Sequence, residues 1–133
     1  MAEAQLALLM KVLGLLDQYA KTVTRQALES NLETWLLTKA ALETAAQCSI
    51  DVATELVTRR GIGLPETYRE SFLALAQAGL IRPELATALA KWAGLRNILV
   101  HMYTVLDLDE IHRALGDTAV LREFHARASE LLR

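Results

Sequence analysis

The chain has 133 residues, so we expect one domain spanning residues 1–133. Hydrophobic residues make up 53% of the chain and charged residues 23%, which excludes a disordered protein, while the formal net charge of −2 excludes a surface that is basic throughout. The only cysteine is Cys48, which excludes an internal disulfide and fits a reducing compartment. The sequence has no Cys/His cluster and no glycine-rich phosphate loop, so we expect no metal and no other cofactor.

The first predicted element is a helix over about residues 2–23. Its apolar stretch "LALLMKVLGLL" (6–16) is interrupted by Lys11, ends at Asp17 and is too short to span a membrane. Glu3 stands where a signal peptide would carry a basic residue. We therefore expect a cytoplasmic protein without a membrane partner, whose first helix is buried on most of its circumference, partly against a partner chain.

A long second helix is predicted from about Gln26 or Ser30 to Arg60, because apolar residues recur there at three-to-four spacing. The segment "GIGLP" (61–65) ends it, with Gly61 placed to close the helix. Thr67 and Glu70 then form a capping box for a third helix that runs to about residue 78.

Gly79 closes the third helix, and Pro83 suits the first turn of a fourth helix that we extend to about residue 105. Asp107 starts a short fifth helix, and Gly116 separates it from a last helix that reaches the C-terminus. These elements predict an all-α, up-down bundle of four main helices plus one or two short ones. The two longest helices should run side by side, and their generous apolar surface favours a homodimer.

The stretch "RNILVHMY" (96–103) places four polar side chains on the fourth helix. With Arg96 at 0° and 100° per residue, Asn97 lies at about 100°, His101 at about 140° and Tyr103 at about 340°, so all four share roughly half of the circumference. Asn97 and His101 are close enough for a side-chain hydrogen bond. From these positions alone, a functional site and an ordinary solvent-facing surface are equally good interpretations.

The same stretch matches the R-x4-H-x-Y signature of the HEPN family, and more narrowly the chain resembles its HepT-like branch. The similarity extends over "IDVATEL" (50–56), "GLPETYRESFLALAQAGLI" (63–81) and "GLRNILVHMYTVLD" (94–107). The branch often carries a Glu-Arg pair in its second helix, where this chain has Lys39 and Ala40.

The resemblance implies a HEPN-like fold and a toxin that cleaves RNA without a metal. It implies that Arg96 and His101 are catalytic, that Asn97 supports them or binds substrate, and that Tyr103 accepts AMP from an MntA-like nucleotidyltransferase antitoxin. Cleavage would use the 2′-hydroxyl of RNA as nucleophile, His101 for proton transfer and Arg96 to stabilise negative charge. A homodimer would supply two histidines for the two proton transfers.

Two other functions remain open at this point. One is a non-catalytic HEPN-like helical module that assists a partner nucleotidyltransferase, and the other is a plain structural dimer. Among further polar residues, His112 and His125 suggest ordinary surface or packing roles. Asp51 is expected to bind a neighbouring helix or to orient the polar group of the fourth helix. Lys91 is expected to be a solvated charge or to extend an RNA-contacting surface.

Overall fold

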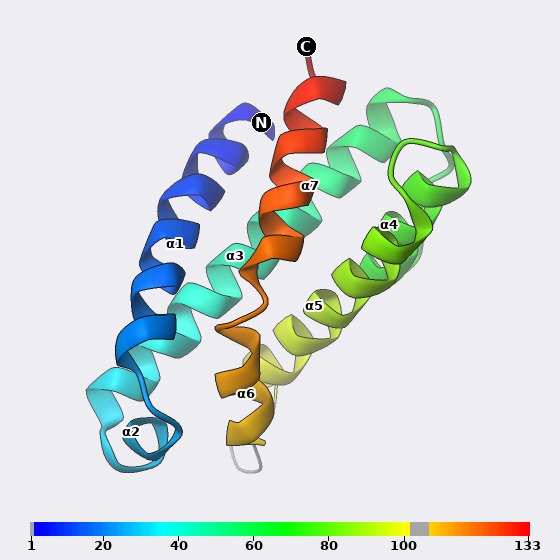
Figure 1. The fold of residues 1–133 in the computed structure, drawn as a ribbon. Helices are drawn as coiled ribbons and strands as arrows, with labels where there is room; N and C mark the ends of the chain where they lie inside the picture. Colours follow the sequence, from blue (N-terminus) through cyan, green and yellow to red (C-terminus); the bar gives the residue numbers. More distant parts are fainter. Residues whose placement is uncertain (1, 102–106) are drawn as a thin grey trace.

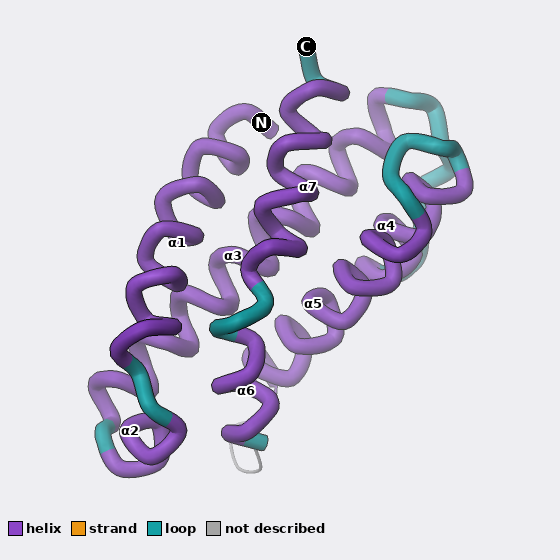
Figure 2. Tube along the Cα trace, viewed as in Figure 1, coloured by secondary structure: helices purple, strands orange, loops and turns teal. Residues whose placement is uncertain are grey.

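In the computed structural model, residues 2–101 and 107–133 are described, and they form seven helices and no strand (Figures 1 and 2). Their bounds are α1 (Ala2–Thr22), α2 (Arg25–Ser30), α3 (Leu32–Arg59), α4 (Tyr68–Gln77), α5 (Pro83–His101), α6 (Leu108–Ala114) and α7 (Thr118–Leu131). The predicted all-α fold with four long helices is confirmed. Within the described part of the chain, none of the helices has the length and apolarity to cross a membrane.

Helix α3 is the centre of the bundle, because it packs against α1, α4, α5 and α7. The long helices α1, α3, α5 and α7 run in alternating directions, while α4 and α5 form a packed pair on one side of α3 (Figure 1). The predicted packing of the two longest helices, α1 and α3, is confirmed.

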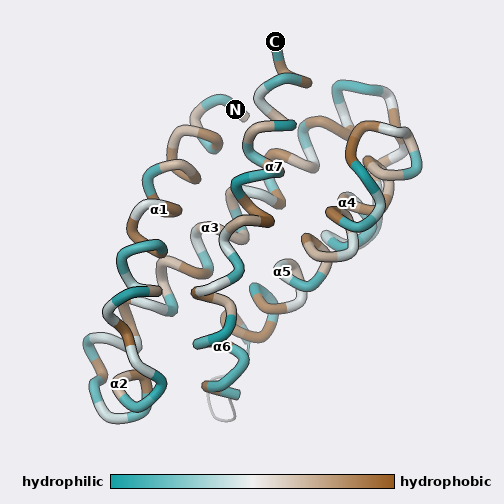
Figure 3. Tube along the Cα trace, in the orientation of Figure 1, coloured by the Kyte–Doolittle hydropathy of each residue, from teal (hydrophilic) through white to brown (hydrophobic). Residues whose placement is uncertain are grey.

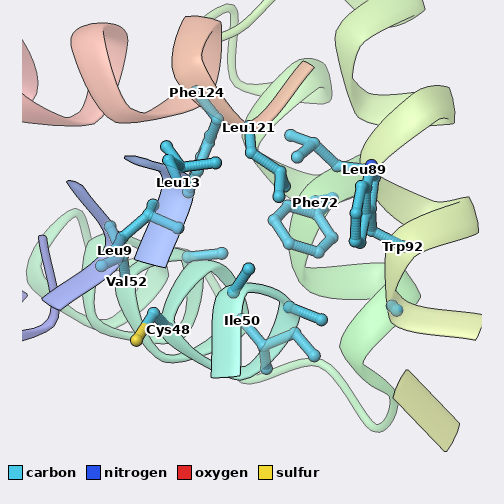
Figure 4. Packing of buried hydrophobic residues seen from close by; sticks show 14 of the residues in the cluster. Leu9, Leu13, Cys48, Ile50, Val52, Phe72, Leu89, Trp92, Leu121 and Phe124 are labelled. Atoms are coloured by element: carbon cyan, nitrogen blue, oxygen red, sulfur yellow. The ribbon is translucent and has the colours of Figure 1, made fainter. Parts of the chain in front are cut away.

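The core is built from one side of each amphipathic helix. Hydrophobic and hydrophilic residues alternate along the helices (Figure 3). Leu9, Leu13, Val52, Phe72 and Phe124 are fully buried, and they come together from four helices (Figure 4). The rings of Phe72 on α4 and Phe124 on α7 meet edge to face, with centroids 5.5 Å apart. This contact ties the last helix to the α4–α5 pair.

Helix α1 is buried on one side only, which differs from the burial expected over most of its circumference, because Leu8, Met10 and Leu15 are exposed. Leu6, Leu9, Val12, Leu13 and Leu16 all point into the core. The helix packs mainly on α3 and α7. A partner chain is therefore not needed to bury the inner side of this helix.

The helix ends follow local chemistry in most places. Gly61 and Gly79 adopt left-handed φ values of 68° and 76°, as expected for residues that close a helix. Thr67 Oγ1 accepts from Glu70 N at 3.2 Å, which confirms half of the predicted capping box. The other half differs, because the Glu70 carboxylate accepts from Glu66 N at 3.0 Å.

Of the two predicted starts of the second helix, the one near Ser30 is close to the observed start at Leu32, and the one at Gln26 is wrong. The structure divides this region into α2 and α3, because Asn31 leaves helical geometry with φ −122° and ψ 106°. Its side chain caps α3 by accepting from Thr34 N at 3.1 Å. Thr24 caps α2 in the same way. At the other predicted boundary, α5 is described to His101, and residues 102–105 lie outside the described residues.

Candidate active site

Helix α5 carries the predicted site on its C-terminal half. Pro83 begins the helix, and Leu85, Leu89 and Leu99 are buried on the side that faces the core. Arg96 is partly buried, whereas Asn97 and His101 are exposed. The helix therefore fixes the backbone of these three residues while leaving their polar groups near the surface.

The Arg96 guanidinium is bound to helix α3. Arg96 Nε donates to Gln47 Oε1 at 2.8 Å. Gln47 Nε2 in turn donates to Asp51 Oδ1 at 2.8 Å, one turn further along α3. The partner of Asp51 thus lies on its own helix rather than on a neighbouring one, and Asp51 is linked to Arg96 only through Gln47. That Asp51 orients the polar group of α5 stays a prediction.

Two further contacts hold the same guanidinium. Arg96 Nη1 donates to Asn97 Oδ1 at 3.1 Å. The central carbon of the guanidinium lies 5.3 Å from the ring centroid of Tyr68, the first residue of α4. This is the distance of a cation–π contact. Arg96 is therefore held from three helices: α3 and α4 supply Gln47 and Tyr68, and α5 supplies Asn97.

The structure brings together only part of the predicted set. Asn97 uses its side-chain oxygen for Arg96 rather than for His101. His101 is the last residue of α5 and is exposed, and its ring makes no hydrogen bond with the described residues. Tyr103 lies outside the described residues, so its predicted place near Arg96 stays a prediction.

Gln47 and Tyr68 were not predicted as site residues. Gln47 lies 49 residues before Arg96, and Tyr68 lies in a loop-to-helix transition, so neither is visible as a motif with Arg96. The one available signal was the four-residue spacing of Lys39, Glu43, Gln47 and Asp51, which puts them on one side of a helix.

A charged pair does occur in the second predicted helix, formed by Lys39 with a glutamate one turn later instead of with its neighbour in the sequence. Lys39 Nζ forms an ion pair with Glu43 Oε1, and both side chains are about three-quarters buried, with exposed fractions of 22% and 27%. The pair lies on the same side of α3 as Gln47. The polar side of α3 therefore extends over about three turns towards the N-terminus of that helix.

The other weighed residues take structural roles. His112 Nε2 lies 3.0 Å from the Val23 carbonyl oxygen, and His125 Nε2 lies 3.0 Å from the Leu6 carbonyl oxygen. Because a carbonyl only accepts, both rings donate from Nε2 and join the C-terminal helices to α1 and the turn after it. The ordinary packing role predicted for both histidines is confirmed.

Lys91 is exposed and lines a hollow of about 400 Å³ with Trp92 and Arg113, between α5 and α6. It is separated from Arg96 by about 140° around α5.

Burial and the nearby charge of Asp51 raise the pKa of the Cys48 thiol to about 11. The described residues contain no group of three or more His, Cys, Asp or Glu side chains placed to bind a metal ion.

Solved structures with the same architecture belong to toxin–antitoxin complexes. A tri-AMPylated Shewanella oneidensis HEPN toxin in complex with MNT antitoxin superposes with a TM-score of 0.87, at 24% identity over 97% of this chain and 96% of that chain. A toxin–antitoxin structure with AMP-PNP gives a TM-score of 0.85, at 23% identity over 96% of each chain. At these identities the likeness establishes the fold, which is the all-α fold of HEPN toxins.

The sequence matches the HepT-like family, described as ribonuclease HepT-like, over residues 9–128. The chain therefore belongs to the HepT-like family. It is 41% identical over 68 residues to the mRNA nuclease HepT of Shewanella oneidensis, covering 51% of each protein. It is 32% identical over 87 residues to the tRNA nuclease HepT of Aphanizomenon flos-aquae, covering 65% of this chain and 59% of that protein. The matches thus span between half and three-fifths of these two relatives.

Proposed function

We propose that this protein is the toxin of a type VII toxin–antitoxin system and an endoribonuclease that needs no metal. The observation that carries the proposal is the Arg96 guanidinium held at the surface by Gln47 and Tyr68, five residues before an exposed His101 on the same helix. The family description and the names of the two nuclease relatives support the same activity.

The proposed reaction uses the nucleophile that RNA carries. A 2′-hydroxyl oxygen attacks the adjacent phosphorus, the bond to the 5′-oxygen breaks, and the products are a 2′,3′-cyclic phosphate and a 5′-hydroxyl. One imidazole takes the proton of the 2′-hydroxyl, and a protonated imidazole gives a proton to the leaving 5′-oxygen. Arg96 donates hydrogen bonds to the phosphate oxygens, on which negative charge increases in the transition state.

A homodimer is part of this proposal, because one His101 per chain supplies only one of the two proton-transfer groups. Leu32 and Leu36 support it, since they are 70% and 52% exposed at the start of α3. Gln47 lies three turns after Leu36, at about 20° from it around the helix. Pairing two chains along this side of α3 would cover the leucines and bring two Arg96–His101 sets towards each other.

Control by a nucleotidyltransferase antitoxin completes the proposal, with the cytoplasm as the compartment. The solved relatives are described as a tri-AMPylated toxin with its antitoxin and as a toxin–antitoxin structure with AMP-PNP. In this chain we assign the acceptor role to Tyr103. Its hydroxyl oxygen would attack the α-phosphorus of ATP, form a phosphodiester with AMP and release pyrophosphate, while the phenolic proton passes to solvent. The added phosphate would pair with Arg96 and compete with RNA.

The proposal is tested by Arg96→Ala and His101→Ala, each expressed without antitoxin. Both variants should be folded, should permit normal growth and should leave RNA intact, whereas the wild type should stop growth. Cleavage by purified wild-type protein should persist in EDTA and leave 2′,3′-cyclic phosphate ends. Arg113→Ala, an exposed arginine on α6, serves as the matched control and should stay toxic. Cleavage that is lost with EDTA and restored by magnesium contradicts the mechanism, and a non-toxic wild type favours the non-catalytic module.

A further inference from the structure

The amide of Gln47 has a defined orientation because of the groups on its two sides. The Asp51 carboxylate can only accept a hydrogen bond, so the Gln47 NH2 group must face it, at 2.8 Å. The guanidinium of Arg96 can only donate, so the Gln47 oxygen must face it, also at 2.8 Å. If the amide were rotated by 180°, both contacts would become repulsive. Asp51 thus favours the same orientation of the Gln47 amide that Arg96 requires, with the oxygen towards the guanidinium.

We propose that Gln47 is a positioning residue of the active site, oriented by Asp51, which holds Arg96 by a neutral hydrogen bond and so keeps its positive charge available for an RNA phosphate. This role rests on the proposed ribonuclease function and adds two residues to it. It explains why an amide, rather than a carboxylate, occupies the position on α3 that meets the arginine.

The chemistry of the contact favours an amide. A carboxylate in place of the Gln47 amide would form a charge-assisted pair with Arg96 and compete with the phosphate for the same guanidinium. The amide oxygen satisfies Nε without adding a charge. The negative charge of Asp51 is kept one side chain away, and its attraction for Arg96 weakens with distance and with exposure to water.

The contacts of the guanidinium with the described residues use Nε, Nη1 and one face of the group. Nε is used by Gln47, Nη1 contacts Asn97, and the Tyr68 ring covers one face. None of the described residues accepts a hydrogen bond from Nη2. Three contacts with the described residues thus set the plane of the Arg96 guanidinium, and none of those residues occupies Nη2, whose N–H groups can donate to a phosphate oxygen.

Three variants test this role: Gln47→Leu, Gln47→Glu and Asp51→Asn, with the exposed Gln18→Glu on α1 as a control for added charge. Gln47→Leu and Gln47→Glu should lower kcat/KM for RNA cleavage by roughly 10- to 100-fold, the effect of a misplaced or neutralised catalytic group. Gln47→Glu should also weaken binding of an RNA that carries a 2′-deoxy nucleotide at the cleavage site and reduce the salt dependence of that binding. Gln18→Glu should behave as wild type in both assays.

A double variant separates positioning from a general structural effect. Because Asp51 acts through Gln47, adding Asp51→Asn to Gln47→Leu should cause no loss beyond that of Gln47→Leu alone. In NMR spectra, the Arg96 Nε–Hε signal should be protected from exchange in the wild type and lose that protection in Gln47→Leu. Losses that add in the double variant, or an active Gln47→Leu protein, would overturn the role while leaving the ribonuclease function intact. A wild type that cleaves no RNA would overturn both.

Discussion

The position of the dimer interface is the most informative prediction, and Leu36→Glu is the change that tests it. Leu36 is 52% exposed on α3, on the same side of the helix as Gln47. If this side pairs two chains, symmetry places Leu36 in the interface twice. Leu8 on α1 is a matched control, because it is a leucine of similar exposure, 45%, on a different surface.

The size of the effect follows from the exposed area. Complete burial of a leucine side chain contributes about 1.5–3 kcal/mol, so covering the exposed half of Leu36 contributes about 1 kcal/mol per chain. Two copies give about 2 kcal/mol, and Leu36→Ala should therefore raise the dimer Kd by about 30-fold. Leu36→Glu removes the same contact and adds two buried carboxylates on the side of α3 that already carries Glu43, at several kcal/mol, and should raise the Kd by more than about 1000-fold.

Light scattering at micromolar concentration provides the assay, with RNA cleavage measured on the same samples. Wild type and Leu8→Glu should have twice the chain mass and full activity, whereas Leu36→Glu should have the mass of one chain and little activity. A dimeric Leu36→Glu together with a monomeric Leu8→Glu would place the interface on α1 instead. A wild type that is monomeric while active would refute the argument that two histidines are required.

Two other predictions concern Tyr103 and Cys48. Tyr103→Phe, if still toxic, should resist neutralisation by catalytically active antitoxin with ATP. Mass spectrometry of wild-type protein co-expressed with the antitoxin should find AMP on the peptide that contains Tyr103. If the antitoxin silences the Phe variant as well as the wild type, AMP is not transferred to this residue. Burial raises the pKa of Cys48 to about 11, so its thiol is neutral at pH 8 and should react with a disulfide reagent only after unfolding in urea. Since the pKa of Cys48 is higher in the folded state, the contribution of its protonation to the free energy of unfolding is complete below the unfolded pKa of about 9 and is lost as the pH rises towards 11. Urea titrations of wild type and Cys48→Ala at several pH values can measure this loss. Rapid reaction of the native thiol at pH 8 would contradict the raised pKa.

Features set by neighbouring residues could be predicted from the sequence. Gly61, Gly79 and Pro83 mark helix ends because their backbone preferences act within one or two residues. Apolar spacing predicted the long helix whose C-cap is Arg60. The Arg96–His101 spacing indicated the site for the same reason, since a helix of known pitch fixes where these side chains lie.

The tertiary structure alone decided which residues complete the site. Gln47 and Tyr68 contact Arg96 because α3 and α4 pack against α5 next to this residue. No pattern within one helix specifies such a contact. The choice between a helix start at Gln26 and one near Ser30 was left open, because the side chain of Asn31 can cap a helix or stay in one. Sequence periodicity determines which side of each helix is buried, whereas the partner of a half-buried polar group depends on how the helices are placed against one another.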